Sequence, residues 1–391
     1  MSALRSIVVV GASLAGVRAA ETLRREGFDG DLTILGEERC APYDRPPLSK
    51  EILAGEMGPD DATLPVAADL DAEWRLGDPA TSLDAERRVV RTAGGDELAY
   101  DGLVVATGSE PRRVPGLEAD GRRVLELRTI EDSLRLRDLL GTASELLIVG
   151  AGFIGVEVAA AARRRGVRTT IVTLDPPLLP AGRLACDAAR RLLDQHGVEV
   201  LQGRTVVSIA AEADRRTATL DDGAQISADA VLVAVGVRPR VGWLDGSGLS
   251  VDDGVLCDEA LRAVGATDVV AAGDVARWPN PLFGGRLMRI EHWSNAIEQG
   301  TAAARALLAG EHAGPFAGVP SFWSDHFGVR LQSVGLPALA DEFVVTGGDV
   351  ASGRFGAAAY HDGQLVGGVA YGMPKAIIAL RAELAKSHVA R

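Results

Sequence analysis

The apolar positions near the start of the chain form a short unbroken run that passes into a helical pattern. Residues 7–10 read IVVV, the turn GASLAG follows, and an alanine-rich stretch extends to Gly27. An apolar run of this length predicts a buried strand, and the stretch after the turn predicts a helix. The same order recurs at residues 146–166, which read LLIVGAGFIGVEVAAAARRRG. The chain therefore contains two copies of one strand–turn–helix unit.

The glycine spacing in the two turns is typical of a dinucleotide fingerprint. The first copy has Gly11 and Gly16 but carries Ser13 where a second glycine usually stands. Serine adds only a small side chain, so the backbone still comes near a phosphate and the hydroxyl adds a donor. The complete set in the second copy is Gly150, Gly152 and Gly155. Because a helix N-terminus offers N–H groups and a positive dipole to a phosphate, two units predict two dinucleotides.

Acidic residues follow two of the predicted strands. Glu37 lies just past the strand DLTIL, where the ribose hydroxyl of a dinucleotide would lie. Residues 268–276, DVVAAGDVA, form an apolar strand that ends in Gly273 and Asp274. A carboxylate there can bind the polyol linker of a flavin, and a solvated turn aspartate fits the pattern equally well. From about residue 317 short strand-like stretches precede a helical pattern, which predicts a small α+β module.

The composition excludes several classes of function. The net charge of −13 over 391 residues argues against a general binder of nucleic acid or of anionic membranes. No apolar run approaches the ~18 residues of a membrane span. Cys40, Cys186 and Cys257 lie far apart, without the spacing of a redox dithiol, a zinc site or an iron–sulfur site. We therefore expect a soluble, cytoplasmic protein of two or three domains without a bound metal.

A set of motifs along essentially the whole chain resembles the FAD-dependent ferredoxin reductases of oxygenase systems. The most specific are YDRPPLSK at residues 43–50 and HWSNAIEQG at 292–300, and they occur together with GASLAG, ATGSEPR, LRTIED, GAGFIGVEVA, AVGVRPR, AAGDVA and FWSD. The resemblance implies an α/β fold with two Rossmann-like dinucleotide-binding domains and a small α+β C-terminal domain. It places an FAD domain at residues 1–113 and 239–316, an NAD domain at 114–238 and an interface domain at 317–391.

The resemblance also implies the positions that bind the cofactors. The FAD contacts fall on Ala15, Glu37, Lys50, Ala80, Arg128, Asp274 and Trp293. The other cofactor-binding positions lie in the two glycine turns and the loops around them: Gly11, Ser13, Gly16, Arg45, Pro46, Gly150, Gly152, Ile154, Gly155, Thr173 and Gly236. Trp293 offers a flat surface and a backbone N–H to the flavin ring, and core packing is its alternative role.

Two charged residues are the candidates for catalysis. The resemblance implies that a hydride passes from NADH to the flavin, and that single electrons then pass to a small iron–sulfur ferredoxin serving a cytochrome P450 or another oxygenase. A cation beside the flavin stabilises the negative charge that this transfer creates, and Lys50 is that candidate. The resemblance further implies that Lys50 pairs with Glu157. We expect Glu157 in the first turn of the second fingerprint helix, facing the nicotinamide.

The end of the second strand of the NAD unit departs from the family pattern. The family usually has a glutamate there, whereas this chain reads IVTLD with Thr173 in that place. Ribose recognition must then use Thr173 or Asp175. A 2′-phosphate needs a cation, and residues 173–182 contain none before Arg183. The sequence therefore favours NADH over NADPH.

Two other functions fit parts of the pattern. Cys40 lies just before the motif APYDRPPLSK, which permits an NADH oxidase or peroxidase with a single redox cysteine. A flavin-bearing interaction protein with slow turnover, like the apoptosis-inducing factors, is a third possibility. The motif APYDRPPLSK contains no cysteine pair, so electrons have no disulfide to reach and leave directly from the flavin. Cys40 does not lie in a motif that matches the single-cysteine enzymes, which favours a free buried thiol at that position.

The C-terminal tail suggests where a ferredoxin docks. Oxygenase-linked ferredoxins are usually acidic, so an evenly acidic reductase would repel its partner. The tail from Lys375 to Arg391 carries Lys375, Arg381, Lys386 and Arg391 against Glu383 alone. We expect this tail, with Trp323 nearby, to form a positive rim that steers the ferredoxin. A solvated helix face is the alternative.

Overall fold

The computed structural model describes residues 4–386, and these fall into two compact units. The first unit contains the described residues up to Asp44, then Thr63–Glu110 and Arg238–Pro320. The second contains Arg45–Ala62, Pro111–Val237 and the described residues from Ser321 onward. Strands β8 (Ser109–Pro111) and β17 (Val237–Pro239) each include a point where the chain passes from one unit to the other.

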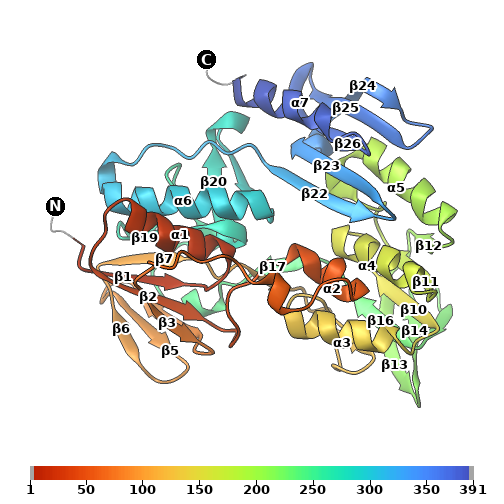
Figure 1. The fold of residues 1–391 in the computed structure, drawn as a ribbon, viewed down its shortest axis with the longest axis horizontal. Coiled ribbons are helices and arrows are strands. Elements are labelled where there is room, and N and C mark those ends of the chain that lie inside the picture. Colours follow the sequence, from red (N-terminus) through yellow and green to blue (C-terminus); the bar gives the residue numbers. More distant parts are fainter. Residues whose placement is uncertain (1–3, 387–391) are drawn as a thin grey trace. The chain divides into compact units, whose positions relative to one another are not determined.

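The first unit is built on a five-stranded parallel sheet (Figure 1). Its order is β19 (Val269–Ala271), β7 (Gly102–Val105), β1 (Ser6–Val10), β2 (Asp31–Gly36) and β3 (Glu73–Leu76). Helices α1 (Leu14–Arg25) and α6 (Trp293–Ala309) pack against each other beside this sheet. Two small sheets complete the unit: β4 (Ala80–Asp84), β5 (Val89–Thr92) and β6 (Glu97–Ala99), and then β18 (Val255–Leu256), β20 (Ala276–Asn280) and β21 (Arg286–Arg289).

The second unit contains another parallel sheet of the same kind. Its order is β12 (Glu199–Gln202), β11 (Arg168–Thr173), β10 (Glu145–Val149), β16 (Ala230–Val233) and β9 (Val124–Leu125). The helices of this part are α2 (Glu51–Ala54), α3 (Ile130–Leu140), α4 (Phe153–Arg164) and α5 (Arg183–Gln195). An antiparallel sheet of β13 (Val206–Glu212), β14 (Arg215–Leu220) and β15 (Gln225–Ala228) shares a core with β10 and β16.

The end of the chain forms an antiparallel sheet with one covering helix. The strand order is β22 (Ser321–His326), β23 (Val329–Gly335), β26 (Gln364–Tyr371), β25 (Arg354–His361) and β24 (Glu342–Asp349). Helix α7 (Lys375–Lys386) buries Ile377, Leu380 and Leu384 against this sheet. The predicted α/β class, with two Rossmann-like sheets and an α+β C-terminal part, is therefore confirmed.

The backbone requires glycine at a fingerprint position in each copy, Gly11 in the first and Gly150 in the second. Gly11 has φ +123°, and a Cβ there would lie 2.1 Å from the carbonyl oxygen of Ala106 on the neighbouring chain segment. Gly150 has φ +103°, and its Cβ would lie 2.3 Å from the oxygen of Ala234. These contacts bring each strand–helix turn onto the end of the adjacent strand, so any side chain would push the turn out of place.

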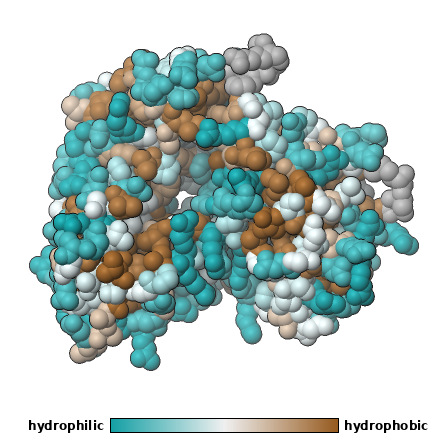
Figure 2. All heavy atoms as spheres, turned by 180° about the vertical axis from the view of Figure 1, so that it is seen from behind, coloured by the Kyte–Doolittle hydropathy of each residue, from teal (hydrophilic) through white to brown (hydrophobic). Residues whose placement is uncertain are grey.

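No helix among residues 4–386 is both long and apolar enough to cross a membrane. On the face drawn in Figure 2, hydrophilic residues surround smaller apolar patches.

Candidate functional site

The N-termini of α1 and α4 are open to an anion. Ser13 is the N-cap of α1, with φ −112°, and its side chain makes no capping hydrogen bond within the described chain. Gly152, the N-cap of α4, has no side chain with which to cap. The first-turn N–H groups of both helices therefore lack a side-chain acceptor, and a pyrophosphate is suited to supply one. Both turns fit a dinucleotide.

The structure explains why serine is tolerated in the first turn. At Gly152 the φ angle is −70°, which any residue adopts, and an added Cβ would meet no atom within 4 Å. Glycine at this position is thus not required by the fold itself. Ser13 has an extended backbone like that of Gly152, so the serine does not change the form of the turn.

Asp274 lies beside the first fingerprint turn. It belongs to a 3₁₀ turn, Gly273–Val275, that follows β19, and the hydroxyl of Ser109 donates to its Oδ2 at 2.6 Å. A Cβ on Gly273 would lie 3.0 Å from the Cβ of Ala15 in α1. The side-chain oxygen of Gln299 accepts a hydrogen bond from the Gly273 N–H at 2.9 Å. Gly273, the residue before Asp274, therefore approaches Ala15 at the carboxyl edge of the sheet.

Trp293 begins α6 and is fixed by a partner that the sequence did not suggest. Its Nε1 donates to the Oδ1 of Asp44 at 2.7 Å, and the ring is only half-buried. An indole ring offers a flat surface to a planar ligand, and the bond to Asp44 fixes the orientation of this ring.

Glu37 also has an unforeseen partner in the first unit. Both of its carboxylate oxygens accept hydrogen bonds from the guanidinium group of Arg240. Ala80, the first residue of β4, lies near the same sheet edge, because the N–H of Asp78 donates to the oxygen of Gly36 at 3.0 Å. The basic loop GVRPR contains Arg240, but nothing in the sequence indicates which carboxylate it binds.

The predicted pair of Lys50 and Glu157 is present in the second unit. The Nζ of Lys50 lies 2.8 Å from Oε2 of Glu157, and the two side chains are 11% and 5% exposed. Lys50 also donates to the carbonyl oxygen of Pro46 at 3.1 Å. Helix α4 begins at Phe153, so Glu157 belongs to its second turn and not to the first turn that we expected.

Two serine hydroxyls complete the environment of Glu157. Ser49 donates to Oε2, the oxygen that also binds Lys50, and Ser324 donates to Oε1. Each carboxylate oxygen thus accepts at least one hydrogen bond, as a buried charge requires. Ser324 comes from β22, so the C-terminal sheet contributes directly to this cluster.

Arg45 and Arg128 of the second unit are joined by a hydrogen bond. Nη1 of Arg45 donates to the carbonyl oxygen of Arg128 at 2.6 Å. Arg128 immediately precedes Thr129, the N-cap of α3, which forms a capping box with Asp132. Pro46 starts the 3₁₀ turn Pro46–Ser49 that leads into Lys50. The capped helix and the proline fix the backbone at both positions.

The two alternatives for ribose recognition differ in the structure. Thr173 is buried, and its hydroxyl donates to the carbonyl oxygen of Asp175 at 2.9 Å. Asp175 is exposed after the end of β11. The geometry therefore favours the carboxylate of Asp175 for a ribose hydroxyl. Ile154 is the second residue of α4, and Gly236, with φ +98°, lies in the loop after β16.

Arg204 is a cation near this ribose position that the sequence did not reveal. Its backbone N–H donates to the carbonyl oxygen of Thr173 at 3.2 Å, because β12 and β11 are adjacent and parallel. Its guanidinium group pairs with Asp222 at 2.8 Å and with Asp221 at 4.0 Å. The charge is already compensated by two carboxylates.

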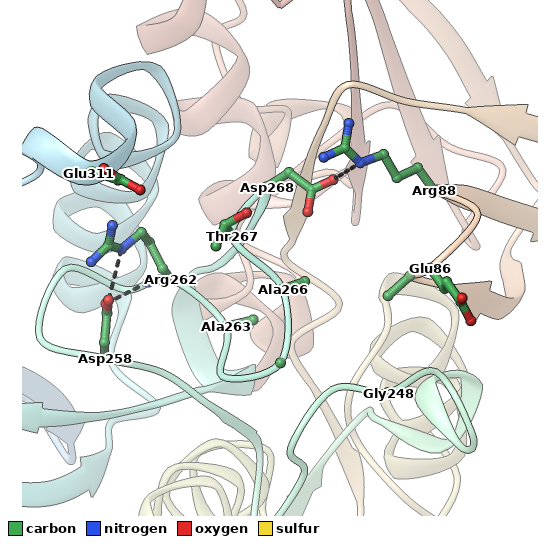
Figure 3. Close-up of a pocket in the computed structure, with 12 residues that line it drawn as sticks. Glu86, Arg88, Gly248, Asp258, Arg262, Ala263, Ala266, Thr267, Asp268 and Glu311 are labelled. Carbon is green, nitrogen blue, oxygen red and sulfur yellow. Dashed lines mark hydrogen bonds and ion pairs between the residues drawn. The ribbon is translucent and has the colours of Figure 1, made fainter. Parts of the chain in front are cut away.

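A pocket of about 850 Å³ in the first unit is not the predicted site (Figure 3). Its charged lining includes two ion pairs, Arg88 with Asp268 at 2.7 Å and Arg262 with Asp258 at 2.8 Å. Asp268 precedes β19, whereas Asp274 follows it, so the pocket lies at the opposite edge of the sheet. None of the predicted cofactor residues lines it.

Comparisons with known proteins agree with this arrangement. The model of the pyridine nucleotide-disulphide oxidoreductase family matches residues 5–300, and a reductase C-terminal model matches residues 321–390. Rhodocoxin reductase of Rhodococcus erythropolis is 36% identical over 97% of this chain and 89% of its own length. The ferredoxin–NAD(+) reductase component of the anthranilate 1,2-dioxygenase system of Burkholderia cepacia is 37% identical, covering 89% of this chain and 86% of its own. The structure of a covalent putidaredoxin reductase–putidaredoxin complex matches with a TM-score of 0.90 at 29% identity, over 98% and 93% of the two chains.

Proposed function

Because the chain belongs to the pyridine nucleotide-disulphide oxidoreductase family, we propose that it is an FAD-dependent NADH:ferredoxin reductase. It passes electrons from NADH to a small iron–sulfur ferredoxin, which serves a cytochrome P450 or a ring-hydroxylating oxygenase. Relatives that match most of this chain are named as reductases of such systems. Residues 1–113 and 239–316 form the FAD domain in this proposal, residues 114–238 the NAD domain and residues 317–391 the interface domain.

The residues of the first unit fit FAD. When bound, FAD accepts a hydride and releases its electrons one at a time. The open N-terminus of α1 would hold the pyrophosphate, and Asp274 would bind the ribityl hydroxyls. Trp293 would lie against the flavin ring, held in place by Asp44. Glu37 would bind the adenosine ribose after giving up one of its two hydrogen bonds to Arg240.

The ion pair of Lys50 and Glu157 is the observation that carries the proposal for catalysis. The side chain of Lys50 is only 11% exposed, so its charge lies among protein groups. Water screens the field of a charge in such a place less than it does at the surface. Lys50 stabilises the negative charge that hydride transfer creates, and Glu157 holds both Lys50 and the carboxamide of the nicotinamide. Pro46 and Ser49 fix the two ends of this pair through their own hydrogen bonds.

Electrons leave for the ferredoxin without a disulfide intermediate. Burial raises the pKa of the Cys186 and Cys257 thiols to about 11 and about 12, so neither is a thiolate at neutral pH. Cys40 is the remaining cysteine of the sequence, and it supplies the alternative of an oxidase or peroxidase. We also propose a cytoplasmic location, where NADH is produced and thiols stay reduced.

A comparison of electron acceptors tests this proposal. Rapid mixing of the FAD-loaded protein with NADH should bleach the flavin, and added ferredoxins should then be reduced faster than oxygen or peroxide. The variant Cys40→Ser should reduce ferredoxin as fast as the original protein. Loss of turnover in Cys40→Ser, or bleaching too slow to support turnover, would reject the ferredoxin reductase in favour of the oxidase or of the slow flavin-bearing interaction protein.

A further inference from the structure

Several polar side chains are buried in the C-terminal sheet, and three of them, Ser324, His326 and Tyr371, form one hydrogen-bonded series. Ser324 and His326 of β22 are both 0% exposed, and Tyr371 of β26 is 1% exposed. Polar groups are buried at a cost unless they form hydrogen bonds. Packing alone would be served equally well by apolar residues, so the choice of these three side chains calls for a separate explanation.

All three side chains project from the same face of the sheet. Ser324 and His326 are two residues apart on one strand, and side chains alternate between faces. Leu331 pairs with both Ser324 and Tyr371, which places Tyr371 on that face too. Phe322, also on this face, has its ring centroid 4.5 Å from that of Phe153 in α4. This face therefore packs on the helix that carries Glu157.

The hydrogen bonds among these groups run in one direction. Ser324 donates to Oε1 of Glu157, since a carboxylate only accepts. Its oxygen is then free to accept from Nε2–H of His326, at 2.9 Å. The other ring nitrogen, Nδ1, accepts from the hydroxyl of Tyr371 at 3.4 Å, the longest contact of the series. The tautomer follows from the partners on each side.

The ring of His326 is neutral, as this direction requires. Burial, together with the positive charge of Lys50, lowers the pKa of His326 to about 3. A neutral imidazole has one N–H donor and one acceptor, so a single arrangement satisfies both of its neighbours. The chain from Tyr371 through His326 to Ser324 thus ends on the carboxylate of Glu157.

We propose that Ser324 and His326 are positioning residues for hydride transfer, because they fix the carboxylate of Glu157 toward Lys50. With Oε1 held by Ser324, the carboxylate cannot rotate, and Oε2 stays on Lys50 and Ser49. Without that bond the carboxylate turns and the ammonium group of Lys50 moves with it. The C-terminal sheet therefore forms part of the redox site. The inference rests on the roles proposed above for Lys50 and Glu157.

Ser333 provides a matched control for Ser324. It lies on β23 in the same sheet and is 1% exposed, and its hydroxyl has no hydrogen-bond partner among the described residues. Ser324→Ala and Ser333→Ala thus remove the same atom from equally buried sites. Only the first removes a bond to Glu157. At His326, glutamine keeps one donor and one acceptor, whereas leucine keeps neither.

The test is flavin reduction by NADH in a stopped-flow instrument, with the limiting rate separated from the apparent dissociation constant. Ser324→Ala should lower the limiting rate by about tenfold, as expected for loss of a hydrogen bond to a charge. His326→Leu should lower the limiting rate too, because Ser324 loses the partner that orients its hydroxyl. The dissociation constant for NADH should change less than the limiting rate. Ser333→Ala should match the original protein, and His326→Gln should recover most of the rate lost in His326→Leu.

Equal rates in Ser324→Ala and Ser333→Ala, or equal losses in His326→Gln and His326→Leu, would overturn the inference. Flavin content and melting temperature are measured for each variant. If Ser324→Ala does not fold, Ser324→Cys makes the same comparison, because a thiol of similar size is a weak donor.

Two further variants separate this inference from the proposed function. Glu157→Gln and Lys50→Met should both slow flavin reduction if their proposed roles are correct. If they do so and Ser324→Ala does not, only the positioning role fails. If neither slows the reaction, the roles of Lys50 and Glu157 fail, and the positioning role fails with them.

Discussion

Lys50 and Glu157 form a nearly buried ion pair with an Nζ to Oε2 distance of 2.8 Å, although they are far apart in the sequence. The pair joins the loop before α2 to the second turn of α4. In a protein with only three lysines, and with arginine at most positive positions, this use of lysine is specific. Lysine presents a compact charge on a flexible stem, where arginine would present a wide planar group.

Replacing Lys50 by methionine should slow flavin reduction by NADH by about tenfold to a hundredfold, because the cation acts on charge that develops in the transition state. The dissociation constant for NADH should rise much less. Rapid-mixing absorbance at several NADH concentrations separates the two quantities. Lys375→Met, the same change at an exposed residue of α7, should have no effect. A raised dissociation constant with an unchanged limiting rate would assign Lys50 to binding instead.

The preference for NADH over NADPH should depend on the ion pairs of Arg204, because a paired guanidinium group attracts a 2′-phosphate less strongly. We expect a higher kcat/KM with NADH than with NADPH, because Asp222 and Asp221 already pair with the guanidinium group. The double variant Asp221→Asn with Asp222→Asn should raise kcat/KM for NADPH by about fivefold, the range of an exposed ion pair. Asp214→Asn, at a 95% exposed carboxylate, serves as the control. An unchanged NADPH value in the double variant would exclude Arg204 from the coenzyme site.

Buried His326 should make the protein sensitive to acid. Its pKa in the folded state is about 3, whereas an unfolded histidine titrates near its ordinary value of 6.5. Between these values the unfolded chain binds more protons, so the stability present at neutral pH is lost as the pH falls. The loss approaches about 1.4 kcal/mol per pH unit.

The variant His326→Gln should lack this loss. Relative to the original protein, its free energy of unfolding should improve by about 3 kcal/mol between pH 6.5 and pH 4. Urea denaturation at a series of pH values measures the difference. His312→Gln, at an exposed position, should follow the original protein throughout. Parallel pH curves for the original protein and His326→Gln would show that the histidine is not neutral in the fold.

The positive rim proposed for ferredoxin docking lies on the C-terminal sheet. Lys375, Arg381 and Lys386 belong to α7, whereas Arg391 lies outside the described residues. Trp323 pairs with Gln332, and the register continues through Ala370 to Gly356, whose Cβ would lie 2.4 Å from Ala376 of α7. Trp323 therefore projects from the face of the sheet that α7 covers. This arrangement supports the rim as a proposal.

Reversing Arg381 and Lys386 to glutamate should lower the association rate with an acidic ferredoxin several-fold at low salt and flatten its salt dependence. Flavin reduction by NADH should stay unchanged, since neither residue belongs to the ion pair of Lys50 and Glu157. Stopped-flow measurements at several ionic strengths test both points. Unaltered ferredoxin turnover at low salt would place the docking face elsewhere.

The glycine turns and the strand pattern allowed the two Rossmann-like units to be predicted from the sequence. Each depends on local rules, namely the positive φ of Gly11 and Gly150 and the apolar runs that precede them. The pairing of Lys50 with Glu157 came from the family resemblance, since no local pattern joins two residues in different parts of the chain.

The remaining members of the site depend on tertiary packing. Ser324 reaches Glu157 only because β22 packs on α4, and Arg204 approaches Thr173 only because β12 lies beside β11. A serine in FWSD or an arginine in QGR has no local feature that marks it as functional. The bond between Asp44 and Trp293 likewise joins residues that no motif connects.

The central claim is that two electrons from NADH leave the protein one at a time for a ferredoxin. Its most direct test is an anaerobic titration, in which limiting NADH is added to the FAD-loaded protein with excess oxidised [2Fe–2S] ferredoxin. The absorbance changes of the flavin and of the ferredoxin then give the number of electrons that each has received. The account predicts about two ferredoxins reduced per NADH, since a hydride carries two electrons and each ferredoxin accepts one. Rapid flavin reduction by NADH without ferredoxin reduction, across a panel of such ferredoxins, would contradict it.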